Sequence, residues 1–151
     1  MGKKHIIQKS QEETIKETDK IEAGIKKEPK VKETAQRFSE AKVYISSSYN
    51  NTIITLTDLS GKALAWKSAG SIGFKGAKKG TAFASSKIGE TIANSALKFG
   101  IEKIHVFVKG IGPGRDSAVR ALMTHGLNIV AIKDITPIPH NGCRPRKVRR
   151  V

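Results

Sequence analysis

The chain has 151 residues, a length that suits one domain, and 28 Lys and Arg against 13 Asp and Glu give a formal net charge of +15. Such an excess opposes compaction unless an anionic partner neutralises it, which favours nucleic acid; an anionic membrane surface and a solvated basic face are the alternatives. One cysteine, Cys143, excludes an internal disulfide and a multi-thiolate metal site.

The first 41 residues differ in composition from the rest. Residues 1–41 hold ten basic and eight acidic side chains (+2), whereas residues 42–151 hold 18 and five (+13). The first segment has too few apolar residues for a core, so we predict a disordered or partly helical extension of unassigned role. A marginal helix is expected from about Gln11 to Lys27, because Ser10 and Glu13 form a capping-box pattern and Pro29 would stop it.

Residues 42–135 show the alternation and spacing of a globular α/β domain. Three β-rich runs separated by Asn50-Asn51 and Ser60-Gly61 predict an antiparallel meander. Two helix–strand units follow, and each crossover should add a parallel strand. The β-β-β-α-β-α-β order predicts a mixed five-stranded sheet covered by helices, with Trp66 in the core rather than serving as a stacking platform. The predicted elements are strands 43–48, 52–58 and 63–68, helix 81–99, strand 103–108, helix 115–124 and strand 127–135.

Two loops contain glycine beside basic residues. Lys75, Lys78 and Lys79 lie among glycines that let a backbone approach a ligand closely, although a solvated flexible loop fits the pattern as well. The run from Gly110 to Arg115 connects a strand to a helix, where backbone N–H groups favour an anion.

The Gly110–Arg115 run does not fit the nucleotide-binding motifs. Asp134 stands where a dinucleotide fold might carry its ribose-binding acid, yet G-x-G-x-x-G fails at Arg115 and at Ser117, and no Gly-Lys-Ser/Thr follows. A sugar-phosphate contact and a plain strand-to-helix turn both remain open.

Residues 136–151 form a proline-broken basic tail. Its last eight residues carry five basic side chains, a composition typical of segments that become ordered against RNA, with a localisation signal or a solvated tail as the alternative. His140 and Cys143 lack the partners that a nucleophilic or zinc site requires. The N-terminus has neither a secretory h-region nor a transit-peptide composition, and no apolar run approaches the roughly 20 residues of a membrane span, so a cytoplasmic protein is expected.

Four motifs in this order closely resemble the family of the eleventh small-subunit ribosomal protein (universal S-eleven), in its bacterial or organellar form. They are Asn50-Asn51-Thr52-Ile53, the run from Ser68 to Gly76, Gly112-Pro-Gly-Arg115 and the run from Thr136 to Pro145. The resemblance covers about residues 42–151. Proline is common in the family where Ile111 and Arg146 stand here, and neither departure removes a positive charge.

The resemblance implies a ribonuclease-H-like three-layer fold without catalytic acids, and a structural role in the cytoplasmic small ribosomal subunit. Its implied partners are small-subunit rRNA, whose helices it would bridge on the platform, neighbouring platform proteins, and mRNA at the Shine–Dalgarno exit cleft. No enzyme activity, cofactor, metal, membrane or small-molecule substrate is expected. The motifs, together with the lysine loop and the tail, predict RNA contacts at Asn50, Asn51, Lys75, Lys78, Lys79, Arg115, His140, Asn141, Arg144, Arg146, Lys147, Arg149 and Arg150.

A free RNA chaperone or regulator shares every electrostatic feature of a ribosomal RNA binder, and a nucleotide-dependent enzyme using the 110–115 turn is the rival from the enzyme class. Binding to ATP or NAD would favour the enzyme, whereas sedimentation with small subunits would separate a ribosomal component from a free chaperone.

Overall fold

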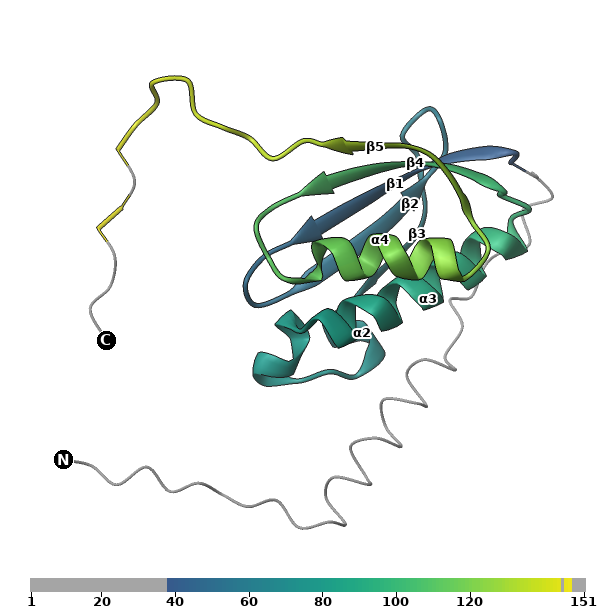
Figure 1. Ribbon diagram of the computed structural model, residues 1–151, viewed down its shortest axis with the longest axis horizontal. Helices are drawn as coiled ribbons and strands as arrows, with labels where there is room; N and C mark the ends of the chain where they lie inside the picture. Colours follow the sequence, from purple (N-terminus) through teal and green to yellow (C-terminus); the bar gives the residue numbers. More distant parts are fainter. Residues whose placement is uncertain (1–37, 145, 148–151) are drawn as a thin grey trace, which may run out of the picture.

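The computed structural model describes residues 38–144, 146 and 147, which form one mixed five-stranded sheet and the helices packed on it (Figure 1). The helix predicted from Gln11 to Lys27 lies outside the described residues. The elements in chain order are β1 (Glu40–Ser47), β2 (Thr52–Thr57), β3 (Ala63–Ser68), α2 (Ala69–Ile72), the 3₁₀ helix η1 (Gly76–Gly80), α3 (Ala82–Lys98), β4 (Lys103–Lys109), α4 (Gly114–Thr124) and β5 (Asn128–Asp134).

The sheet has the strand order β3-β2-β1-β4-β5. β1 pairs antiparallel with β2, and β2 with β3, whereas β4 lies parallel to β1 and β5 parallel to β4. The meander and both parallel additions are therefore confirmed. Val43 on the central strand faces Leu56 of β2 and Val106 of β4, and all three side chains are buried.

Helix α3 packs against the sheet through its apolar face. Thr81 caps its start by accepting a hydrogen bond from the N–H of Ala84 at 3.2 Å. Ile88 and Ile92, one turn apart on the apolar face, are fully buried. Gly100 ends the helix with a φ of +75°, a left-handed conformation that glycine adopts without steric cost. The apolar residues whose spacing predicted this helix are the residues that pack against the sheet.

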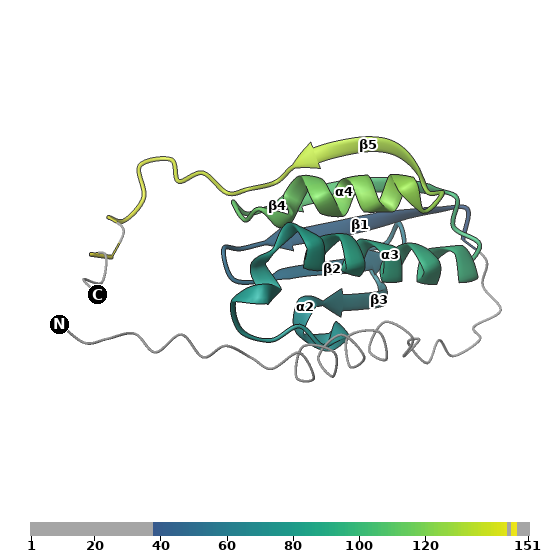
Figure 2. The same ribbon diagram turned by 60° about the horizontal axis from the view of Figure 1, so that its bottom comes forward.

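The helices cover one face of the sheet only, so the described residues form two layers and the three-layer expectation is wrong for them (Figures 1 and 2). In β1, Val43 and Ile45 are buried while Tyr44 and Ser46 on the opposite face are partly or fully exposed. Both crossovers move the chain in the same direction across the sheet order. Right-handed crossovers of that kind place their helices on the same side.

The uncovered face explains the error at Trp66. Trp66 lies on β3 with its side chain on this face and is 61% exposed, so it does not belong to the core. Tyr44 and Phe107, paired across β1 and β4, stack on the same face with ring centroids 5.0 Å apart. In this sheet, an aromatic residue in a strand therefore indicates β propensity rather than burial in the core.

Candidate nucleic-acid interface

Four segments gather at one end of the sheet, which we call the loop end: residues 48–51, 69–81, 110–115 and 134–136. They follow the carboxyl ends of β1, β3, β4 and β5 (Figure 1). Because these four strands run in the same direction, the segments after them must meet at one edge. Crevices outside the carboxyl ends of parallel strands are the usual ligand position in open α/β sheets.

Glycines allow these segments to touch through their backbones. A Cβ atom at Gly112 would lie 2.5 Å from the Ser47 hydroxyl oxygen, and one at Gly80 would lie 3.2 Å from the Tyr49 carbonyl carbon and collide with its oxygen. Gly110 has a φ of +98° and passes equally close to the Ser47 carbonyl. The glycines therefore serve the packing of the protein backbone at these points.

The packing of the 110–115 turn weakens the nucleotide-binding hypothesis. Gly112 N–H donates to the Ser47 carbonyl at 3.0 Å, and Gly110 N–H donates to the Thr136 hydroxyl at 3.1 Å. Pro113 between Gly112 and the helix has no N–H to offer. The backbone donors that a phosphate cradle would need from these two glycines already serve the fold.

A buried cluster of three hydroxyl groups supports the loop end from below. Ser47, Thr52 and Ser85 are each 2% exposed or less. Ser85 donates to the Thr52 hydroxyl at 2.8 Å, and the Thr52 and Ser47 oxygens lie 3.3 Å apart. The cluster joins β1, β2 and α3 beneath the loops, and periodicity alone gave no signal for it.

The two predicted asparagines lie in the tight turn between β1 and β2. Ser48 N–H donates to the Asn51 carbonyl at 2.9 Å, and Asn51 N–H donates to the Ser48 hydroxyl at 3.2 Å. Asn50 is exposed at the turn. The Asn51 amide oxygen is buried and accepts no hydrogen bond, the only such side-chain atom in the described part of the chain.

The predicted lysines lie on and beside η1, in a loop for which the sequence predicts no secondary structure. Lys75 and Lys78 are exposed and Lys79 is half-buried. Ser68 and Ser71 form a reciprocal capping box at the start of α2, and Gly73 ends that helix with a φ of +112°. The lysine loop is thus a shaped segment, held at the loop end by the contact between Gly80 and Tyr49.

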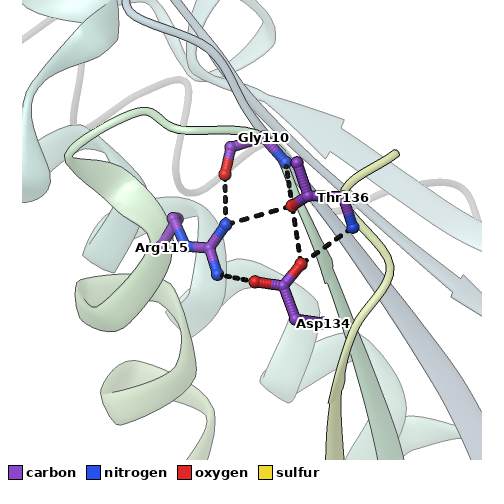
Figure 3. A network of polar contacts seen from close by, with 4 residues as sticks. All are labelled: Gly110, Arg115, Asp134 and Thr136. Carbon is purple, nitrogen blue, oxygen red and sulfur yellow. Dashed lines mark hydrogen bonds and ion pairs between the residues drawn. The ribbon is translucent and has the colours of Figure 1, made fainter. Parts of the chain in front are cut away.

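Arg115 reaches the loop end, but its guanidinium points into a polar network (Figure 3). It donates to the Gly110 carbonyl, to the Asp134 carboxylate and, at 3.3 Å, to the Thr136 hydroxyl. The hydrogen bond from the Thr136 hydroxyl, followed by that from Arg115, lowers the pKa of Asp134 to about 2. Asp134, considered above as a ribose-binding acid, is therefore ionised and engaged within the protein.

The described part of the tail is exposed and carries its predicted residues into solvent. His140, Asn141, Arg144, Arg146 and Lys147 are all exposed. Asn141 adopts a φ of +59°, a left-handed conformation that asparagine tolerates in turns. Arg149 and Arg150 lie outside the described residues.

Charge is unevenly distributed along the sheet. Glu40, Asp58 and Glu102 lie at the end opposite the loop end, at the start of β1, after β2 and before β4. The described acids at the loop end are Asp116 and Asp134, of which Asp134 is paired with Arg115. The surface that carries Lys75, Lys79 and the tail is therefore strongly cationic, which suits a polyanion.

These features define a class: a small α/β protein whose lysine loop and basic tail form one cationic end, a surface that suits an anionic partner. None of the helices in the described part of the chain is long and apolar enough to cross a membrane.

Comparison with known proteins identifies the family. The family model for ribosomal protein S11 matches residues 41–150. The small ribosomal subunit protein uS11 of Treponema pallidum (strain Nichols) is 57% identical over 112 residues, covering 74% of this chain and 89% of the relative. The protein of the same name from Borreliella burgdorferi (strain ZS7) is 52% identical over 120 residues, covering 80% and 92%. The chain belongs to the ribosomal protein S11 family.

Proposed function

We propose that this chain is a structural, non-enzymatic constituent of the small ribosomal subunit that binds rRNA on the platform. There it bridges separate rRNA helices beside neighbouring platform proteins and helps form the Shine–Dalgarno and mRNA exit cleft. Family membership supports the ribosomal role. The observation that carries the RNA-binding role is the meeting of the Asn50 turn, the lysine loop and the basic tail at one cationic end of the sheet. The strand order and mixed pairing likewise support a ribonuclease-H-like arrangement of the sheet.

The mode of binding follows from the chemistry of the two partners. The lysines of the loop end and the basic residues of the tail neutralise phosphates, and each neutralised phosphate releases counterions. Side chains read little sequence in the deep groove of double-helical RNA, so shape must provide specificity. The shaped turn at Asn50 and the loop at Lys75 provide it, while the tail extends to a second RNA element.

The test compares binding at several salt concentrations. Lys75→Gln/Lys79→Gln removes two charges from the loop end, and Lys62→Gln/Lys103→Gln removes two from the opposite end as a matched control. Affinity for a small-subunit rRNA transcript is measured against an unrelated RNA of equal length. We expect the loop-end variant to reduce the salt slope by about one unit for each phosphate that it no longer neutralises, with little change in the control.

Equal slopes for both variants would remove the loop end from the interface. If the unmodified protein showed no preference for the small-subunit transcript, alone and with its assembly neighbours, the ribosomal proposal itself would fail. Crosslinking from the tail, followed by RNA sequencing, tests the platform and cleft location: crosslinks to the body or head of the subunit alone would refute it.

A further inference from the structure

The network around Arg115 is the last point at which the described tail is attached to the domain (Figure 3). Ile135 N–H donates to the Val108 carbonyl at 2.8 Å and continues the β4–β5 pairing by one residue. Thr136 follows with its hydroxyl inside the network. Among the described residues beyond Thr136, none makes a hydrogen bond to the domain.

The Thr136 hydroxyl uses its full hydrogen-bonding capacity within the network. The hydroxyl donates its one proton to the Asp134 carboxylate at 2.6 Å and accepts from Gly110 N–H at 3.1 Å and from Arg115 at 3.3 Å. The Thr136 N–H also donates to Asp134, at 2.8 Å. A hydroxyl has one proton and two lone pairs, so its position and rotamer are fully determined.

The prolines after Thr136 restrict the backbone of the tail where it leaves the sheet. Pro137 follows Thr136 directly, and Pro139 comes two residues later. Proline fixes its own φ and restricts the residue before it to extended conformations. A chain that is fixed at Thr136 therefore leaves the sheet in a narrow range of directions, beside the 110–115 turn.

The position of Asp134 is unfavourable for RNA binding if charge alone determines the affinity. A carboxylate next to a surface that binds a polyanion is repelled by each nearby phosphate. By pairing with Arg115 it also occupies a guanidinium that phosphate would otherwise attract. Both effects lower RNA affinity unless the pair contributes something that offsets them.

We propose that Arg115, Asp134 and Thr136 form a clamp that orients the basic tail, so that the tail and the lysine loop meet RNA in one preorganised arrangement. These three are positioning residues. Arg115, predicted from its motif as an RNA contact, acts through the tail. The proposal rests on the RNA-binding function proposed above and adds how the tail is aimed. Preorganisation raises affinity because less conformational freedom is given up on binding.

The decisive variant removes a negative charge. Charge alone predicts that Asp134→Ala tightens RNA binding, because one repulsion disappears and Arg115 is released. The clamp predicts weaker binding, by roughly five- to tenfold at constant salt, since the tail loses its orientation. Asp116→Ala is the matched control: Asp116 lies in the first turn of α4 at the same end, and makes no ion pair in the described part of the chain. It should bind as tightly as the unmodified protein or tighter.

A second pair of variants leaves the net charge unchanged. Thr136→Val removes the hydroxyl and should weaken binding, whereas Thr136→Ser keeps it and should retain the affinity of the unmodified protein. Circular dichroism melting shows that each variant compared is folded. The defect should also disappear in a full-length background in which the tail is neutralised at Arg144, Arg146, Lys147, Arg149 and Arg150.

The outcomes separate the two proposals. If Asp134→Ala tightens binding as much as Asp116→Ala, or if its defect persists when the tail is neutralised, the clamp does not orient the tail. If the unmodified protein does not prefer small-subunit rRNA, the proposed function fails, and the clamp, which rests on that function, fails with it. Weaker binding by Asp134→Ala and Thr136→Val, present only with a charged tail, supports the clamp.

Discussion

Replacing Gly114 by alanine tests how the loop end is held together. Gly114 is the first residue of α4 and lies directly on the buried hydroxyl cluster. An added Cβ would lie 2.9 Å from the Ser85 Cβ and would overlap the hydroxyl oxygens of Ser85 and Thr52. Either the start of the helix moves away from α3 and β2, or the hydroxyl groups separate.

The cost has two parts and one offset. Overpacking costs about 1–3 kcal/mol. Disrupting the buried 2.8 Å hydrogen bond between Ser85 and Thr52 adds about 1–3 kcal/mol, because a buried hydroxyl loses its partner. Restricting the unfolded chain returns about 0.4–1 kcal/mol. We therefore expect Gly114→Ala to lower the free energy of unfolding by about 3 kcal/mol, the centre of a summed range of about 1–5.5 kcal/mol.

Urea denaturation followed by circular dichroism measures this destabilisation. Gly70→Ala is the control, because a Cβ there meets nothing nearer than 3.8 Å. Its stability should remain within about 1 kcal/mol of the unmodified protein. A Gly114→Ala protein as stable as the Gly70→Ala protein would refute the reasoning, and would reopen the possibility that this glycine is present for a ligand.

Three further outcomes are expected. The folded pKa of Asp134 is about 2 against an ordinary value of 3.8, so the ionised carboxylate stabilises the fold at pH values above 3.8. The difference in stability between the unmodified protein and Asp134→Ala should therefore stay constant above about pH 4. It should shrink as the pH falls towards 2 in acid titrations. Ile92→Ala should cost about 2–5 kcal/mol in denaturant melts, because Ile92 is fully buried in α3. Trp66, the single tryptophan, should be quenched readily by acrylamide in the folded protein, and Trp66→Ala should cost less than about 1 kcal/mol.

The strands and long helices were predictable because each has one buried face. Period-two alternation in β1 and three-to-four spacing in α3 are direct records of contact with the core. The order of the strands in the sheet could not be predicted in this way, because the chain crosses from β3 at one edge to β4 beside β1. Which face the helices cover depends on that order, so the bare face and the exposure of Trp66 could not be predicted from a local pattern.

The members of the loop end were predictable one by one, but their partnerships were not. Glycine and basic residues identified the lysine loop, the 110–115 turn and the tail. Nothing in the sequence indicated that Arg115 faces Asp134, 19 residues away, rather than solvent. An arginine at a helix start and an acid at a strand end each resemble ligand-binding groups until the fold brings them together.

That pairing changes how the charge of the molecule is to be understood. If affinity for RNA were set by net charge alone, the loop end would gain from losing every carboxylate, and Asp134 would be a defect. The carboxylate is instead bonded to Arg115 and twice to Thr136, at the residue where the basic tail leaves the sheet. A flexible tail offers its charges in many directions, most of which miss a rigid RNA surface. Under the proposed clamp, the one negative charge of Asp134 fixes the direction in which a tail with five positive charges near its end leaves the sheet, and so strengthens the binding of that tail to RNA.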